Sequence, residues 1–317
     1  MNRRHKGIIY SLITLILLMP LLFFLVSYLQ TSGSRDELSN LKIRGIEISN
    51  FANSVSEDVP RILKITAKRA LISAINEIDM NGTPLDDAQF RIVELMLNAT
   101  LNGTNSTFMN GSSLEDWASR MEILGTKYGF STNITFLYLN VSPYDSFSLE
   151  FQMVLFVNAT DPDGMVSIMR TYNISYLHSI EGLEDPLYPL STNGFVKRIV
   201  KRSQFNVDNV SNCDIAIANE TYMSSNDGAS FFDRMENKTV IQPKYSSLSP
   251  NTIGLESFAN VQRIAQVGVP VKVNQTVVDH LYFNGTAVDG CTVVGSSYSW
   301  FRLDLAHNAT YNVSTVC

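Results

Sequence analysis

The chain has 317 residues, of which 45% are hydrophobic, and its 24 basic and 30 acidic residues give a formal net charge of −6. An acidic surface repels phosphate, so this balance argues against nucleic acid or anionic lipid headgroups as the main partner. The part beyond the N-terminal apolar segment is longer than one typical domain, so we expect one large domain or two modest ones.

A charge-free apolar segment occupies Ile8–Leu29. As a helix, its 22 residues rise about 33 Å, which covers a hydrocarbon core of about 30 Å. Arg3, Arg4 and Lys6 precede it. The positive-inside rule therefore predicts a single-pass cell-membrane protein with a cytoplasmic segment 1–7, a transmembrane helix 8–29 and an extracellular portion 30–317.

A cleaved secretory signal is the alternative interpretation of the same segment. The apolar region of such a signal usually has about 7–15 residues and ends in a small-x-small site. The segment here is longer, and Ser32-Gly33-Ser34 fits a cleavage site poorly. We therefore favour a retained anchor.

Residues 34–80 carry the pattern of a long amphipathic helix. Ser34-Arg35-Asp36-Glu37 has the form of a capping box and predicts a helix start, and Pro60 is expected to kink the helix or restart it near Asp58. We interpret the segment as a helical stalk packed on its own domain, with a bundle between subunits as the alternative. The apolar stripe at three-four spacing comprises Leu38, Leu41, Ile48, Ala52, Val55, Val59, Ile62, Leu63, Ala67, Ala70, Leu71, Ala74 and Ile78.

Residues 84–185 are expected to hold helices followed by an antiparallel β-hairpin. Thr83 and Pro84 predict a helix start, with the helix continuing to about Leu97, and Ser113 predicts the start of another short helix. Between these helices, four sequons fall within thirteen residues rich in Gly and Ser. Such a stretch is typical of an exposed loop.

From about Asn133 the apolar period changes to two. Apolar and polar residues alternate over 149–157 and again over 166–176, and Asp161-Pro162-Asp163-Gly164 between them is a turn signal. The pattern predicts a long hairpin with one buried face and one wet face. Asn158 and Asn173 both fall on the wet face.

A boundary is expected at residues 186–202, which contain Pro186, Pro189 and a basic run. Residues 190–317 are predicted to form a second extracellular α/β region, which is mixed and mainly β. In it we expect short strands at 277–283 and 300–305 and short helices near 230–235 and 260–265. The predicted fold class is α+β: a transmembrane helix running into a long helical stalk, an antiparallel β-sheet domain, and this second region.

Sixteen of the 27 asparagines lie in Asn-x-Ser/Thr, whereas random order would give roughly five such sequons. The excess predicts that nearly the whole chain passes through a glycosylating compartment and lies outside the cell. The candidate glycosylation sites are Asn81, Asn98, Asn102, Asn105, Asn110, Asn133, Asn140, Asn158, Asn173, Asn209, Asn219, Asn237, Asn274, Asn284, Asn308 and Asn312.

The three cysteines, Cys213, Cys291 and Cys317, allow at most one internal disulfide. We predict a Cys213–Cys291 bridge, which leaves Cys317 free to pair between molecules. In the alternative, all three are buried or free thiols.

The residues that usually carry chemistry show no pattern. None of the histidines His5, His178, His280 and His307 has a second ligand at metal spacing, and His280 is interpreted as a structural residue on a strand. No nucleophile elbow or phosphate-binding loop occurs. We therefore predict no catalytic residue, no metal, no cofactor and no enzymatic activity. The basic run at 197–202 is interpreted as a solvated helix face, with contact to an anionic polymer as the alternative.

The residues Lys6-Gly7, followed at once by Ile8-Ile9-Tyr10-Ser11-Leu12, resemble the N-termini of archaeal type IV pilin-like surface proteins. The segments 179–186 and 254–258 also look like stretches found in uncharacterised archaeal membrane-anchored surface glycoproteins. The resemblance implies processing between Gly7 and Ile8, and surface-layer or pilus-type protein partners. Leu12 departs from the family pattern, because assembling pilins carry Glu at the fifth mature position.

These features together predict a membrane-anchored cell-surface glycoprotein of structural or interaction type, with a pilin-like N-terminus. Its partners would be the membrane and other surface proteins, and not nucleic acid. The alternative function is a ligand- or solute-recognising extracellular domain of a membrane protein.

Overall fold

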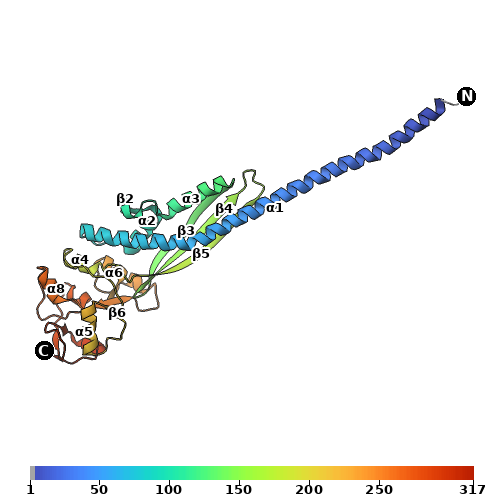
Figure 1. Cartoon of the computed structure of the whole chain (residues 1–317). Coiled ribbons are helices and arrows are strands. Elements are labelled where there is room, and N and C mark those ends of the chain that lie inside the picture. Colours follow the sequence, from blue (N-terminus) through green and yellow to red (C-terminus); the bar gives the residue numbers. More distant parts are fainter. Residues whose placement is uncertain (1–3) are drawn as a thin grey trace. The chain divides into compact units, whose positions relative to one another are not determined.

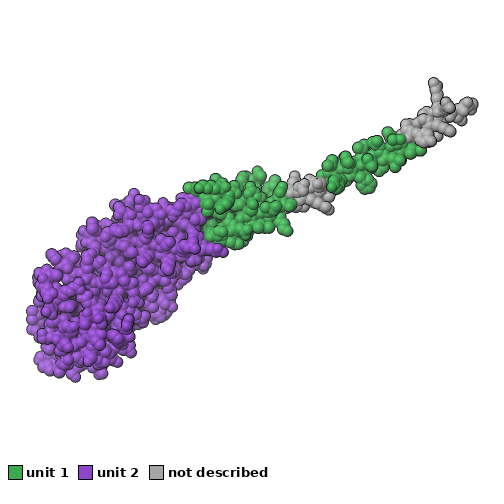
Figure 2. Space-filling view, in the orientation of Figure 1, with its two compact units in different colours: residues 1–55, 122–133, 157–170 green, residues 56–121, 134–156, 171–317 purple. Residues whose placement is uncertain are grey.

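The computed structural model describes residues 4–317, except for the side chains of residues 4–11 and 30–38. The chain is mixed α/β, with an N-terminal helix and small antiparallel sheets (Figure 1). It divides into two compact units, coloured in Figure 2. Unit 1 holds Met1–Val55, Glu122–Asn133 and Val157–Arg170, and unit 2 holds Ser56–Met121, Ile134–Phe156 and Thr171–Cys317.

Helix α1 spans Arg4–Asn81 without interruption. The helix start predicted at Ser34 and the restart predicted near Asp58 are therefore wrong. Pro60 removes one helical hydrogen bond, but its ring faces solvent while Val59 and Leu63 are fully buried, so packing of the neighbouring side chains maintains the helix. The Gly7–Ile8 processing site and the Ser34–Glu37 capping box have side chains outside those described.

The stretch Leu12–Leu29 of α1 has a mean hydropathy of 2.6, and none of its residues is buried. Among the described residues it is the one helical segment long and apolar enough to cross a membrane. A signal sequence near the N-terminus can also form an apolar helix of this kind, so this property alone is compatible with either a membrane span or a signal peptide.

The apolar stripe predicted for α1 is buried from Ile48 onwards. In unit 1, Phe51 packs against Tyr128 and Phe130, with ring centroids 6.4 and 6.0 Å apart. In unit 2 the buried members of the predicted stripe are Val59, Ile62, Leu63, Ala67, Ala70, Leu71, Ala74 and Ile78. The three-four spacing therefore identified the packed face of the helix correctly.

Replacing Leu71, which is fully buried, with Ala should lower the free energy of unfolding by about 2–5 kcal/mol, because the cavity cannot fully collapse. The neighbouring Ile72 is exposed, and Ile72→Ala should change it by less than about 1 kcal/mol. Urea unfolding of the detergent-solubilised full-length protein measures both values. Equal losses in the two variants would show that this face of α1 is not a packing surface.

Two further helices follow α1. Helix α2 spans Ala88–Asn98, and its N-cap is Asp87, whose side chain accepts a hydrogen bond from the Phe90 N–H. The start predicted at Thr83 is therefore wrong, since the carboxylate of Asp87 supplies the cap. Helix α3 spans Leu114–Lys127, and Ser113 caps its start as predicted, since the Asp116 N–H donates to the Ser113 hydroxyl. Between them lie strands β1 (Thr100–Leu101) and β2 (Thr104–Asn105) and the 3-10 helix η1 (Thr107–Met109).

The predicted hairpin is present within a three-stranded sheet of order β3-β4-β5. Its strands are β3 (Ser131–Asp145), β4 (Ser148–Thr160) and β5 (Ser167–Ser179). Along β4, buried and half-buried residues alternate without exception, and Asn158 lies on the half-buried face. The turn at residues 161–166 is closed by the Asp161 N–H, which donates to the Val166 carbonyl.

The rest of unit 2 consists of short elements: α4 (Leu187–Ser191), α5 (Val210–Asn219), β6 (Tyr222–Ser230), α6 (Phe231–Met235), α7 (Pro243–Ser246), β7 (Gly254–Ser257), α8 (Val261–Gln266), α9 (Asp279–Tyr282), β8 (Cys291–Val293), β9 (Arg302–Leu303), α10 (Leu305–Thr310) and β10 (Thr315–Val316). The helices predicted near residues 230–235 and 260–265 are confirmed as α6 and α8. The strand predicted at 277–283 is wrong, because this segment forms α9.

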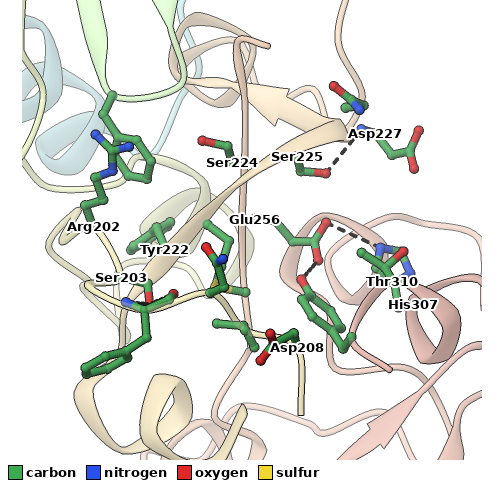
Figure 3. A pocket seen from close by; sticks show the side chains of 17 residues that line it. Arg202, Ser203, Asp208, Tyr222, Ser224, Ser225, Asp227, Glu256, His307 and Thr310 are labelled. Atoms are coloured by element: carbon green, nitrogen blue, oxygen red, sulfur yellow. Dashed lines mark hydrogen bonds and ion pairs between the residues drawn. The ribbon is translucent and has the colours of Figure 1, made fainter. Parts of the chain in front are cut away.

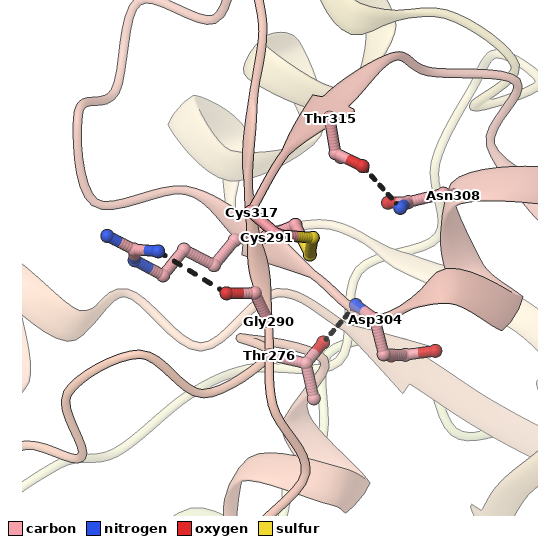
Figure 4. The surroundings of a disulfide bond; sticks show 8 residues. Thr276, Gly290, Cys291, Asp304, Asn308, Thr315 and Cys317 are labelled. Atoms are coloured by element: carbon pink, nitrogen blue, oxygen red, sulfur yellow. Dashed lines mark hydrogen bonds between the residues drawn. A yellow bond between two sulfur atoms is a disulfide. The ribbon is translucent and has the colours of Figure 1, made fainter.

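The disulfide joins Cys291 to Cys317, with Cα atoms 4.5 Å apart (Figure 4), so the predicted Cys213–Cys291 bridge is wrong. Strands β8 and β10 pair antiparallel with Val316 opposite Thr292, and this register brings Cys317 opposite Cys291. Cys213 is a buried free thiol in a core with Ile217 and Phe258. Burial, together with Asp214 and Asp208, raises the pKa of the Cys213 thiol to about 12.

Non-reducing digestion should therefore yield a peptide containing Cys291 linked to the C-terminal peptide containing Cys317. The double variant Cys291→Ser/Cys317→Ser should lose about 3–4 kcal/mol of stability, as the chain-entropy model gives for a loop of this length. Cys213→Ala should leave the linked peptide in place. Linkage of Cys213 to either other cysteine would contradict the pairing.

Candidate functional site

A pocket of about 570 Å³ opens in unit 2 (Figure 3). Polar side chains of β6, among them Ser224 and Ser225, form part of its wall. Arg202 and Phe147 form another part, with the guanidinium of Arg202 5.1 Å from the Phe147 ring centroid. At the base lie Glu256, His307 and Tyr311, the first two of them labelled in Figure 3.

Glu256 belongs to a buried group with two histidines from distant segments. It lies on β7 and is 3% exposed, while His280 on α9 is 1% exposed and His307 on α10 is 6% exposed. The three potential ligand atoms all lie within 4.8 Å of one another. We call Glu256, His280 and His307 the His-Glu cluster.

The carboxylate of Glu256 lies at similar short distances from the two histidines. Oε2 of Glu256 lies 3.3 Å from Nε2 of His307 and 3.4 Å from Nε2 of His280. The other carboxylate oxygen, Oε1, accepts a hydrogen bond from the Tyr311 hydroxyl. One oxygen of Glu256 therefore remains directed at both imidazoles.

Asp304 orients His307. It is the N-cap of α10, where its Oδ1 accepts from the Ala306 and His307 N–H groups, and its Oδ2 lies 2.7 Å from Nδ1 of His307. This contact turns Nε2 of His307 toward Glu256.

The charges of the cluster follow from these contacts. Burial disfavours a charged Glu256, but His280 and His307 outweigh burial and hold the pKa of this carboxyl well below its usual value. Burial lowers the pKa of His307, but Asp304 and Glu256 outweigh it and raise the pKa to about 10. His307 is thus a cation between the carboxylates of Asp304 and Glu256.

Two residues of a buried ionic network directly adjoin residues of the His-Glu cluster in the sequence. Nη1 of Arg234 is 2.6 Å from Oδ2 of Asp185 and 2.9 Å from Oδ2 of Asp279, and all three side chains are 0% exposed. Oδ2 of Asp185 also accepts from the Tyr222 hydroxyl, and Oδ2 of Asp279 accepts from Ser257. Every buried charge here has both an ionic and a hydrogen-bonding partner.

This network positions two residues of the His-Glu cluster, because the residues adjacent to them in the sequence belong to the network. Asp279 directly precedes His280, and Oδ1 of Asp279 accepts from the His280 N–H at 2.7 Å. Ser257 directly follows Glu256 on β7. Arg234 therefore ties together the backbone segments that carry Glu256 and His280.

Replacing Arg234 with Met should lower stability by about 3–5 kcal/mol, because Asp185 and Asp279 would be left buried without their counter-charge. Arg263→Met is the matched control: Arg263 pairs with Glu220 at 2.6 Å, but both side chains are partly exposed, and the expected loss is below about 1 kcal/mol. Thermal unfolding of both variants tests this difference. A mild effect of Arg234→Met would contradict the assigned role of the network.

The candidate glycosylation asparagines are distributed over the described surface. Twelve of the sixteen are exposed, the other four (Asn140, Asn158, Asn284 and Asn308) are half-buried, and none is buried. Every sequon asparagine is therefore at least partly accessible in the folded chain.

The basic run at 197–202 is not a solvated helix face, because none of it is helical. Arg198 is buried and donates to the Phe258 carbonyl at 2.7 Å. Lys197 is exposed and forms ion pairs with Asp79 and Glu184. Only Arg202 of this run lines the pocket at the His-Glu cluster.

Sequence reasoning missed the His-Glu cluster. Its members are separated by 24 and 27 residues, which matches no metal-binding motif. The available signal was coarse: two of the three histidines beyond the N-terminal segment lie in the last 40 residues. Only the pairing of β7 with β6 and the positions of α9 and α10 bring the three side chains together.

A comparison of the chain with protein-family models, with curated proteins and with solved structures finds no match.

Proposed function

We propose that the protein is a membrane-anchored cell-surface glycoprotein of structural or interaction type. Residues 8–29 would be the transmembrane helix, residues 1–7 would be cytoplasmic, and residues 30–317 would face the exterior. The observation that carries the proposal is the accessibility of all sixteen sequon asparagines in the folded chain, in a sequence where roughly five sequons are expected by chance.

The exposure of α1 supports the anchor. None of the residues 12–29 is buried, so this stretch presents apolar side chains all round. A helix that is apolar on every side and unpacked favours a lipid environment. The later part of the same helix is buried on one face only, as expected for a helix that packs on a folded domain in water.

The positions of Asn158 and Asn173 on the hairpin support glycosylation. On β4 the odd-numbered residues from Leu149 to Ala159 are buried, and Asn158 lies on the opposite face. On β5, Asn173 is exposed. A glycan at either site would project away from the core, so folding does not oppose the modification.

The pilin-like N-terminus suggests surface-layer or pilus-type protein partners, reached after cleavage between Gly7 and Ile8. Leu12 stands where assembling pilins carry Glu, which favours surface display over growth of a filament. A ligand-recognising extracellular domain is the second candidate, and the pocket at Glu256 and His307 is the observation that favours it.

Peptides containing Asn158 and Asn173 from protein purified from its membrane should carry glycans, seen as mass shifts. Thr160→Ala keeps Asn158 but destroys its sequon, and should remove that shift just as Asn158→Gln does. Asn193 is exposed but lies outside any sequon, and should stay unmodified. Bare peptides at both sites, with a body that resists protease added to intact cells, would place residues 30–317 inside the cell.

The mass of the mature protein tests the anchor in the same sample. A first residue of Met1 supports a plain anchor, and Ile8 supports pilin-type processing. A start beyond Gln30 would identify the apolar segment as a cleaved signal and exclude the membrane-anchored form.

A further inference from the structure

We propose that Glu256, His280 and His307 bind a divalent transition-metal ion of the Zn²⁺ type, with one coordination position open to the pocket. The inference depends only on unit 2 and is independent of where the protein resides. It rests on four observations: the ligand spacing, the unsatisfied ring of His280, the residues that orient the ligands, and the access from the pocket.

Two of the three separations between ligand atoms match those of a tetrahedral ion, and all three ligand atoms lie within 4.8 Å of one another. With ligands about 2.0–2.1 Å from the metal, neighbouring ligand atoms of a tetrahedron lie about 3.3–3.4 Å apart. The two distances from Oε2 of Glu256, to His307 and to His280, are 3.3 and 3.4 Å. These separations are long for N–H···O hydrogen bonds, whose usual range is about 2.7–3.2 Å.

The ring of His280 needs a partner. It is 1% exposed, and neither ring nitrogen has a hydrogen-bond partner among the described residues. A buried polar group without a partner loses its hydration with no compensation. Its Nε2 faces Oε2 of Glu256, so an ion between the two would satisfy the imidazole by coordination.

The surrounding residues fit a metal site. Asp304 holds Nδ1 of His307 at 2.7 Å, which leaves Nε2 as the ligand atom, and a carboxylate behind a ligating histidine is a common outer-shell arrangement. Tyr311 holds the Glu256 oxygen that does not face the histidines. The backbone positions of Glu256 and His280 are held through the Arg234 network.

The donor set selects the class of ion. Two imidazole nitrogens and one carboxylate oxygen suit Zn²⁺ and related first-row ions, whereas Mg²⁺ and Ca²⁺ prefer sites made of oxygen alone. Glu256 and His307 line the pocket, which supplies an entry path and room for water or an anionic ligand on the metal. Three protein ligands with an open fourth position distinguish such a site from a closed structural one.

Zinc binding to the tag-free, full-length protein in detergent tests the proposal. After removal of metal with a chelator and dialysis, equilibrium dialysis should show one tightly bound Zn²⁺ per chain. Co²⁺ in its place should give the intense visible absorption of a tetrahedral site. X-ray absorption of the zinc form should show imidazole and oxygen ligands and no sulfur. These measurements use the unmodified protein, so they do not depend on whether variants fold.

Variants then locate the ion. Glu256→Gln, His280→Gln and His307→Gln should each weaken Zn²⁺ binding by more than about 100-fold, and the positioning variant Asp304→Asn by about 10–100-fold. His178→Gln is the matched control: His178 is also a buried histidine of unit 2 but lies outside the His-Glu cluster, and its replacement should leave affinity unchanged.

Three results would overturn the proposal. The first is failure of the unmodified protein to hold stoichiometric Zn²⁺, which would make the cluster a metal-free ion-pair group. The second is binding that survives all three ligand substitutions, which would indicate adventitious surface binding only. The third is an equal loss of binding in His178→Gln.

Discussion

The full burial of Arg234 is the constraint around which unit 2 is organised. A guanidinium removed from water is costly unless counter-charges and acceptors surround it. Asp185 and Asp279 supply the charges, while the Ala229 and Leu255 carbonyls accept hydrogen bonds from Nε and Nη2. These partners come from four separate parts of the chain. The ion pairs and hydrogen bonds of Arg234 therefore require these segments to pack together. They limit the other arrangements that β6, β7, α6 and α9 could adopt.

The same constraint gives the pocket its chemistry. Ser257 and Asp279 belong to the Arg234 network, and their chain neighbours Glu256 and His280 belong to the His-Glu cluster. An ionic network can hold the chain neighbour of a polar residue in place. The polar side chain can then stay buried, although burial alone would be unfavourable for it. The histidines thus occupy a site that packing alone would fill with apolar side chains.

Helix α1 joins two stretches with different surfaces. From Leu12 to Leu29 it is apolar on every face, and from Ile48 onwards it is apolar on one face, which packs against the folded chain. Most backbone hydrogen bonds are satisfied within the helix in both stretches, so a single helix continues from one to the other, through Pro20 and Pro60. A surface rich in sequons on the folded part fits the same division.

Local patterns in the sequence determined much of the fold. The stripe of α1, the alternation along β4 and β5, the cap at Ser113 and the short helices near 230–235 and 260–265 could be predicted, because each depends on residues only a few positions apart. Tertiary structure decided the rest. The register of β8 with β10, and not loop length, selects Cys317 as the partner of Cys291. The segment of His280, expected as a strand, forms a helix turn in which the buried Asp279 pairs with Arg234, which lies 45 positions away. The His-Glu cluster joins residues 24 and 27 positions apart, and a contact of that kind exists only once distant segments have packed.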